Sequence, residues 1–239
     1  MTVSYVDFLG ISFLTAPQAS IRQYLIDRSQ QVGVQVVSTI NPEMVSIAMK
    51  DARLMSLFHH SICLADGTGI VMFARVLFGI RLVKMTGIEL CQTLLDSGAL
   101  KFYLLGAHPD VLTQCLARLS ARYPGASIVG SHHGYFSEED WGGILIDIQC
   151  KEPDFVLLGL GFPKQQWVSD RIKQSLKRGI VVGVGGAFDV WSLSKKRAPV
   201  FIQKMGLEWL FRTMIEPRRI RRWPLLGAYV IYVLKKRFF

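Results

Sequence analysis

Short stretches that are apolar at almost every position alternate with longer amphipathic stretches from about residue 34 of this chain onward. A strand that is buried on both faces of a sheet is apolar throughout, whereas a half-exposed strand alternates apolar and polar residues. The amphipathic stretches between the apolar ones predict helices that cover both faces of the sheet. The order of the segments therefore predicts an α/β fold built on a parallel sheet.

The boundaries of these segments follow from where each apolar run begins and ends. Strands are predicted at residues 34–40, 61–65, 101–106, 127–130, 154–160 and 179–184. Helices are predicted at residues 42–58, 67–78, 87–96, 109–123, 137–150 and 164–176. The segment before residue 34 predicts a short strand or hairpin followed by a helix.

The formal net charge of +10 is concentrated at one end of the 239-residue chain. Basic and acidic residues balance over residues 1–194, with 16 of each, whereas residues 195–239 hold 12 basic residues and two acidic ones. Such a local excess indicates an anionic partner. We therefore expect two parts, a core at residues 1–194 and a basic helical appendage at residues 195–239.

The appendage combines its charge with apolar residues. Residues 202–212 have an amphipathic helical pattern, residues 217–222 are strongly basic, and residues 225–234 are apolar apart from a glycine and tyrosines. A short apolar segment with basic flanks is typical of a helix that lies in a membrane interface, and it is too short to span a bilayer. A basic helix packed on its own domain is the alternative. Nucleic acid is a third candidate partner, but no nucleic-acid-binding motif supports it.

In a parallel sheet, ligands bind beyond the carboxyl ends of the strands. The residues at the ends of the predicted strands and just after them are therefore candidates for a site, and the polar ones include Thr39, Asn41, Asp66, Tyr135, Gln165 and Asp189. Asp66 also precedes a predicted helix, where a carboxylate can simply cap the first turn. From the local sequence alone, capping and catalysis are both open for Asp66.

Two features narrow the chemistry. The glycine clusters 159–161 and 183–186 do not form the G-x-G-x-x-G turn of dinucleotide-binding enzymes, which weakens the alternative of an NAD-dependent enzyme. The chain has no Asp-x-Asp pair to hold a divalent metal on a nucleotide diphosphate, and its five histidines form no metal-ligand motif. We therefore expect no metal and no cofactor. A diphosphate would instead need basic side chains, for which Lys84 and the C-terminal arginines are available.

Taken in order, these segments resemble the WecG/TagA/CpsF family of bacterial glycosyltransferases. The resemblance covers about residues 35–222 and rests on the runs Thr39-Ile-Asn41-Pro-Glu-Met, Ala65-Asp66-Gly-Thr-Gly, Thr86-Gly-Ile-Glu-Leu, Gly134-Tyr-Phe136, Gly161-Phe-Pro-Lys-Gln165, Gly183-Val-Gly-Gly-Ala-Phe-Asp189, Lys196-Arg-Ala-Pro199, Gly206-Leu-Glu-Trp-Leu-Phe-Arg212 and Glu216-Pro-Arg-Arg. Each run is short and weak by itself, but the runs occur in the same order as in the family, and together they are specific for it. One departure is Lys84, where the family usually has arginine. Lysine keeps the positive charge but cannot make the bidentate hydrogen bonds of an arginine guanidinium group.

The resemblance implies a Rossmann-like core and an inverting, metal-independent hexosyltransferase. Such an enzyme moves N-acetylmannosamine, N-acetylmannosaminuronic acid or glucose from a UDP-sugar to a polyprenyl-diphosphate-linked sugar in cell-envelope or exopolysaccharide biosynthesis. It implies a cytoplasmic protein associated peripherally with the inner face of the cell membrane. There the basic appendage would dock on the anionic surface and help to close the active site. The sequence does not distinguish among the three donors.

By the same resemblance, Asp66 corresponds to the general base that takes the proton from the acceptor hydroxyl. Thr39, Asn41 and Gln165 correspond to residues of the sugar or acceptor pocket. Asp189 lies in a motif near the nucleotide, and Lys84 is expected to face the donor diphosphate. One or more of Arg218, Arg219, Arg221 and Arg222 are expected to approach the diphosphate, and Tyr135 is expected to bind substrate. An alternative from another functional class is a non-catalytic nucleotide-binding component of an envelope-assembly complex.

Overall fold

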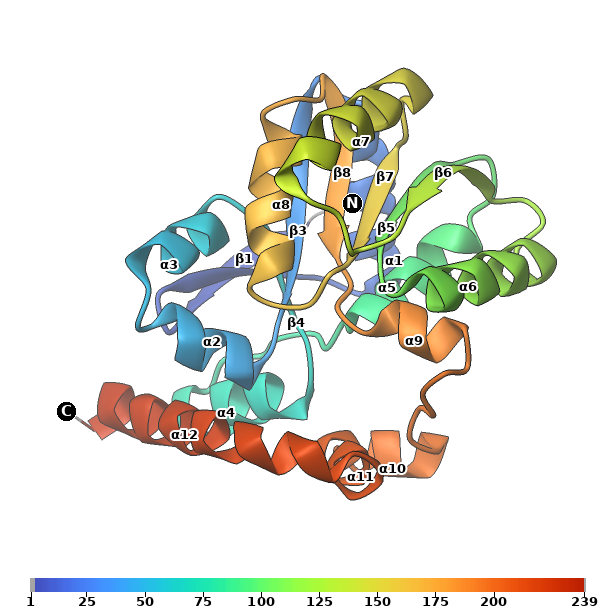
Figure 1. Cartoon of the computed structure of the whole chain (residues 1–239). Coiled ribbons are helices and arrows are strands. Elements are labelled where there is room, and N and C mark those ends of the chain that lie inside the picture. The colour runs from blue at the N-terminus through green and yellow to red at the C-terminus, as the bar shows by residue number, and fades with distance from the viewer. Residues whose placement is uncertain (1–2, 239) are drawn as a thin grey trace.

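The computed structural model, which describes residues 3–238, contains an eight-stranded sheet in the order β1-β2-β4-β3-β8-β7-β5-β6 (Figure 1). β1 and β2 form an antiparallel hairpin, and the other neighbouring strands pair in parallel. This confirms the predicted α/β fold. The strands are β1 (Ser4–Phe8), β2 (Ile11–Thr15), β3 (Gly33–Ile40), β4 (Ile62–Ala65), β5 (Lys101–Gly106), β6 (Ser127–His132), β7 (Phe155–Gly159) and β8 (Arg178–Gly183).

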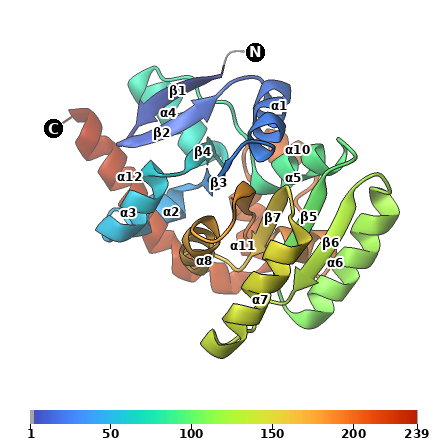
Figure 2. The ribbon, with the colours of Figure 1, turned by 90° about the horizontal axis from the view of Figure 1, so that it is seen from above.

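Helices cover both faces of the parallel part of the sheet (Figure 2). One face packs against α1 (Gln18–Ser29), α5 (Gly87–Leu95), α6 (Pro109–Arg122) and α9 (Ala187–Trp191). The other packs against α7 (Glu138–Lys151) and α8 (Lys164–Lys173). Successive residues of β7 alternate between these two buried clusters, which explains why the strand is apolar throughout.

The predicted helix at residues 42–58 is wrong in one respect, because two helices occupy this segment. They are α2 (Pro42–Ala48) and α3 (Ala52–His59). Asp51 ends the continuity, since its carboxylate accepts hydrogen bonds from the backbone N–H groups of Arg53 and Leu54 at 2.9 and 3.2 Å. An aspartate that caps a new helix in this way satisfies donors that a continuous helix would have paired with its own carbonyls.

The last helix, α12 (Trp223–Phe238), runs along the underside of the molecule beside α2 and α4 (Thr68–Phe78) (Figure 1). Its side chains Tyr229 and Val233 are fully buried, and the Tyr229 ring meets the Phe73 ring edge-on at 5.6 Å between centroids. Ile231 remains 58% exposed. One side of the predicted interfacial segment at residues 225–234 thus packs on the rest of the protein, and the other side faces outward.

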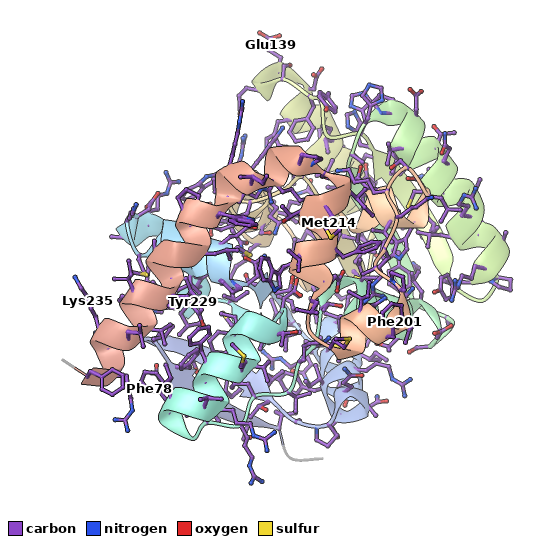
Figure 3. All side chains as sticks on the ribbon, turned by 90° about the horizontal axis from the view of Figure 1, so that it is seen from below. Phe78, Glu139, Phe201, Met214, Tyr229 and Lys235 are labelled. Atoms are coloured by element: carbon purple, nitrogen blue, oxygen red, sulfur yellow. The ribbon has the colours of Figure 1, made fainter. Side chains whose placement is uncertain are left out.

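Between α9 and α12 lie two short helices, α10 (Val200–Lys204) and α11 (Glu208–Ile215), and the 3-10 helix η1 (Pro217–Arg222). The amphipathic pattern at residues 202–212 is interrupted at Gly206, whose φ of +76° ends α10. Phe201 and Met214 project from this region on the underside (Figure 3) and are 64% and 74% exposed. Within residues 3–238, no helix combines the length and the apolar character needed to cross a membrane.

Candidate functional site

The carboxyl ends of β3, β4 and β8 meet, and they bring three of the candidate residues together. Ile40 pairs with Ala65, and the backbone N–H of Asp66 donates to the carbonyl of Ile40 at 2.8 Å. The hydroxyl of Thr39, which is buried, donates to the carbonyl of Gly183 at 3.2 Å. Asp66 therefore lies directly beside the segment that carries Thr39 and Asn41.

Asn41 and Asp66 both stand just before a helix, but only Asn41 is a cap. The side-chain oxygen of Asn41 accepts a hydrogen bond from the backbone N–H of Met44 at 3.0 Å, which leaves its amide N–H groups available. The N-cap of α4 is Gly67, with φ at +88°, and no side chain caps this helix. The capping alternative for Asp66 is therefore excluded. Within the described part of the chain, the Asp66 carboxylate has no hydrogen bond or ion pair.

The charge state of Asp66 is unusual for an aspartate. Burial raises its pKa from 3.8 to about 7. The guanidinium of Arg212 lowers the pKa, the carboxylates of Glu208 and Glu89 raise it, and the ammonium of Lys84 lowers it. A carboxylate with a pKa near the working pH is both partly ionised and basic enough to take a proton from a hydroxyl group. The site can therefore supply a general base.

Gln165 and Lys84 reach this end of the sheet from two further elements. Gln165 is buried on α8, and its side-chain oxygen accepts a hydrogen bond from the backbone N–H of Gly185 at 3.1 Å, just beyond β8. Lys84 forms a parallel bridge with Ala65, and its charge lowers the pKa of Asp66. Both residues thus belong to the group around Asp66.

Tyr135 and Asp189 lie after β6 and β8. Tyr135 is 70% exposed, and its ring meets the ring of His108 edge-on at 5.5 Å between centroids. The ammonium of Lys164 donates to the carbonyl of Gly134 at 3.0 Å and thereby fixes the loop that carries Tyr135. The carboxylate of Asp189, on α9, lies 3.5 Å from the ammonium of Lys195. An exposed aromatic ring and a partly exposed carboxylate suit contacts with a base and a ribose.

The four C-terminal arginines lie in η1, and their surroundings differ. The guanidinium of Arg219 pairs with the carboxylate of Glu216 at 3.0 Å, and that of Arg222 pairs with Glu43 on α2 at 3.1 Å. The side chain of Arg221 is exposed. The expectation for Arg218 lies outside the described part of the structure, because its side chain is not placed.

The sequence did not predict a network of charged side chains, three of which act on the pKa of Asp66. Glu89 accepts a hydrogen bond from Arg197 at 3.1 Å, Arg197 lies 4.0 Å from Glu208, and Glu208 accepts a hydrogen bond from Arg212 at 2.6 Å. Two fragments of this network have a sequence signal: Glu208 and Arg212 are four residues apart, and Glu89 follows Thr86 at capping-box spacing. The link through Arg197 has none, because Arg197 and Glu89 are 108 residues apart.

With this geometry in place, the chain was compared with known proteins. A family model described as the "Glycosyl transferase WecG/TagA/CpsF family" matches residues 6–239. The chain belongs to this family. It is a hexosyltransferase, as the resemblance of its motifs implied.

Relatives within the WecG/TagA/CpsF family are similar along nearly the whole chain. A protein of Staphylococcus aureus (strain NCTC 8325 / PS 47) is 30% identical over 239 residues, which cover 97% of this chain and 93% of that protein. A protein of Bacillus subtilis (strain 168) is 30% identical over 220 residues, which cover 90% of this chain and 84% of the relative. Both are named N-acetylglucosaminyldiphosphoundecaprenol N-acetyl-beta-D-mannosaminyltransferase.

Proposed function

We propose that this protein is an inverting glycosyltransferase that moves a sugar from a UDP-sugar to a polyprenyl-diphosphate-linked sugar in cell-envelope biosynthesis. The names of the relatives favour N-acetylmannosamine as the donor sugar over N-acetylmannosaminuronic acid and glucose. They also favour N-acetylglucosaminyl-diphosphoundecaprenol as the acceptor. The observation that carries the proposal is the carboxylate of Asp66, whose pKa is raised to about 7 beside two cationic side chains, Arg212 and Lys84.

In the proposed reaction, Asp66 removes the proton from a hydroxyl group of the acceptor sugar. The hydroxyl oxygen then attacks the anomeric carbon of the donor, and the bond from that carbon to the UDP oxygen breaks with inversion. The two carboxylates whose charge raises the pKa of Asp66, those of Glu89 and Glu208, are paired with arginines, which leaves Asp66 to act as the base. A single available carboxylate favours one displacement step over two.

The departing UDP carries charge that the protein must stabilise. Lys84 and Arg212 are suited to this role because both place positive charge next to Asp66. Asp189 remains a predicted contact near the nucleotide, and Tyr135 remains a predicted substrate contact. Thr39, Asn41 and Gln165 remain the predicted lining of the sugar or acceptor pocket. Arg219, Arg221 and Arg222 remain candidates for the diphosphate; for Arg219 and Arg222, the ligand would have to replace a carboxylate.

We further propose that residues 195–239 form an appendage that docks the enzyme on the anionic inner face of the cell membrane. Exposed apolar side chains support this proposal. Phe201 and Met214 of the appendage lie on the underside (Figure 3). Met205 of the appendage and Met72 and Val76 of α4 are exposed as well. The twelve basic residues of the appendage add electrostatic attraction of about 1 kcal/mol for each one that approaches an anionic leaflet.

UDP release tests the catalytic proposal. The purified protein is incubated with a panel of UDP-sugars and a prenyl-diphosphate-linked N-acetylglucosamine, and UDP release is measured. We expect turnover with UDP-N-acetylmannosamine, and a loss of about 10²–10⁴-fold in the variant Asp66→Asn. Near-normal turnover of that variant would refute the role of Asp66. Binding of UDP without its release from any donor would support the non-catalytic alternative.

Sedimentation with vesicles tests the docking proposal. We expect the protein to sediment with vesicles that contain phosphatidylglycerol and to remain in solution with vesicles of phosphatidylcholine alone. The double variant Phe201→Glu/Met205→Glu should sediment less, whereas Ile146→Glu should sediment like the wild type, because Ile146 is equally exposed (60%) but lies on α7. Equal sedimentation of both variants would contradict the docking surface.

A further inference from the structure

Helices α10 and α11 meet the rest of the protein with almost no apolar anchoring. Among the side chains that the structure describes at residues 200–215, only that of Thr213 is buried. Phe201 and Met214 face outward (Figure 3), and the apolar side chains Ile202, Leu210 and Phe211 are only partly buried and belong to none of the three hydrophobic clusters of the core. By contrast, α12 is anchored by the buried side chains of Tyr229 and Val233. Partial apolar burial alone therefore anchors α10 and α11 weakly, and polar contacts have to contribute.

These two helices nevertheless lie against the loop that carries Asp66. Gly206, in the turn between α10 and α11, packs on Thr68, the second residue after Asp66. A Cβ atom added at Gly206 would lie only 2.6 Å from Cγ2 of Thr68. The charges of Glu208 and Arg212 on α11 both act on the pKa of Asp66. The position of α11 therefore determines the surroundings of the carboxylate.

The charged network supplies the missing connection. Its first member, Glu89, is fixed in the core, because its second carboxylate oxygen accepts a hydrogen bond from the backbone N–H of Thr86 at 3.2 Å. Arg197 lies in the segment before α10 and stands between Glu89 on α5 and Glu208 on α11, at 3.1 and 4.0 Å. Glu208 in turn holds Arg212 at 2.6 Å. One arginine thus links the core to the helix above Asp66.

We propose that Glu89, Arg197, Glu208 and Arg212 form an ionic latch that holds α11 over the Asp66 loop, with Glu89, Arg197 and Glu208 as positioning residues for Arg212 and Asp66. This inference rests on the proposed role of Asp66 as the base. The side chains of the latch are 20–34% exposed, so water and salt can reach them. Ion pairs of this kind are weaker than buried ones and are screened by salt. The latch can therefore open and close while α12 stays anchored.

Opening of the latch has a chemical consequence at Asp66. It moves Glu208 and Arg212 away and exposes the carboxylate of Asp66, which is half-buried in the closed state, to more water. Since burial is the largest cause of the raised pKa of Asp66, opening lowers that pKa toward 3.8. Lys84 and Glu89, the other charged groups that act on Asp66, stay in place because they belong to the core. An open latch therefore leaves a solvated, weaker base without the arginine beside it.

Hydrogen–deuterium exchange of the full-length protein tests the latch without any substrate. In the variant Arg197→Gln, we expect amides at residues 200–215 to exchange about tenfold faster or more, while amides at residues 223–238 keep their wild-type rates. Arg197→Lys should restore part of the protection, because it keeps one positive charge between the two carboxylates. The control is Arg171→Gln, which breaks a comparable pair with Glu138 at 2.8 Å on α7 and α8 and should change neither segment.

The pH dependence of kcat/KM separates positioning from a merely structural role. In Arg197→Gln, kcat/KM should fall about tenfold or more at pH 8, and the midpoint of its acid limb should move below the wild-type value. Unchanged exchange at residues 200–215, or an unchanged midpoint in a variant that has lost activity, would overturn the proposal. If Arg197→Gln does not fold, the wild type in 1 M NaCl replaces it: selective acceleration of exchange at residues 200–215 supports the latch, and its absence overturns it.

Discussion

The raised pKa of Asp66 leads to a quantitative prediction about the pH dependence of catalysis. Burial raises this pKa from 3.8 to about 7. If the ionised carboxylate is the base, kcat/KM follows its ionised fraction, which is roughly a tenth at pH 6 and roughly a hundredth at pH 5. We therefore expect kcat/KM to rise about tenfold from pH 5 to pH 6 and about fivefold from pH 6 to pH 7, and to level off above pH 8. An aspartate that kept its pKa of 3.8 would give almost no change over this range.

UDP release at donor concentrations well below KM measures kcat/KM directly, and the free enzyme's ionisations then determine the profile. Donor and acceptor diphosphates also titrate, so Asp66→Asn serves as the control. Its residual activity, about 10²–10⁴-fold lower at pH 8, should lose the acid limb. Circular dichroism at each pH, together with recovery of activity on return to pH 8, excludes unfolding as the cause of the decline.

Two results would refute this reasoning. A flat wild-type profile from pH 5 to pH 8 would mean that the pKa of Asp66 is not raised in the free enzyme or that Asp66 is not the base. An acid limb of the same midpoint in Asp66→Asn would assign the limb to the substrate or to another group of the protein.

Three further changes have expected outcomes that follow from burial and backbone geometry. Burial opposes ionisation of Asp66, so the ionised carboxylate destabilises the folded protein. This destabilisation is close to zero below about pH 4 and is complete above the folded-state pKa of about 7. The variant Asp66→Asn should therefore raise the free energy of unfolding in urea by up to about 4 kcal/mol at pH 8 and hardly change it at pH 4. Gly206 has a φ of +76° and packs against Thr68, so Gly206→Ala should lower kcat/KM about tenfold. The control Gly227→Ala should retain activity, because a Cβ atom there meets nothing within 4 Å. Equal kcat/KM for the two variants would contradict the contact. Tyr229→Ala should lower the free energy of unfolding by about 3–5 kcal/mol, while Tyr229→Phe should be neutral or stabilising because the buried hydroxyl has no partner among the described residues; a costly Tyr229→Phe would reveal one.

The periodicity of the sequence was sufficient to predict the parallel sheet, and its limits have identifiable causes. The strand at residues 101–106 begins and ends as predicted, because an apolar run there is bounded by Lys101 and Gly106. The helix break at Asp51 was missed because the apolar pattern continues across it. The helices of residues 195–239 could be predicted only in outline, because a basic apolar helix can face a membrane or its own domain, and α12 has a buried side and an exposed one.

Some features of the candidate site could likewise be predicted from the sequence, and others could not. Thr39, at the carboxyl end of one strand, and Asp66, just after the next, could be placed together from the sequence because parallel strands end at one edge of a sheet. The sequence did not decide whether Asp66 caps a helix, since this depends on the backbone angles of Gly67. Nor could it predict that Arg197 meets Glu89, because such a contact depends on how the appendage folds back over the core.

The pairing of β3 with β8 has a consequence for synthesis on the ribosome. Thr39 and its hydrogen-bond acceptor Gly183 are 144 residues apart, so the hydrophobic strand that carries Thr39 is made long before its neighbour. During this interval, β3 can pair only with β4, and its other edge stays open to incorrect partners. The nascent chain thus acquires Asp66 early, but the residues of β8 and α8 beside this end of the sheet are added only when the second half of the chain has emerged.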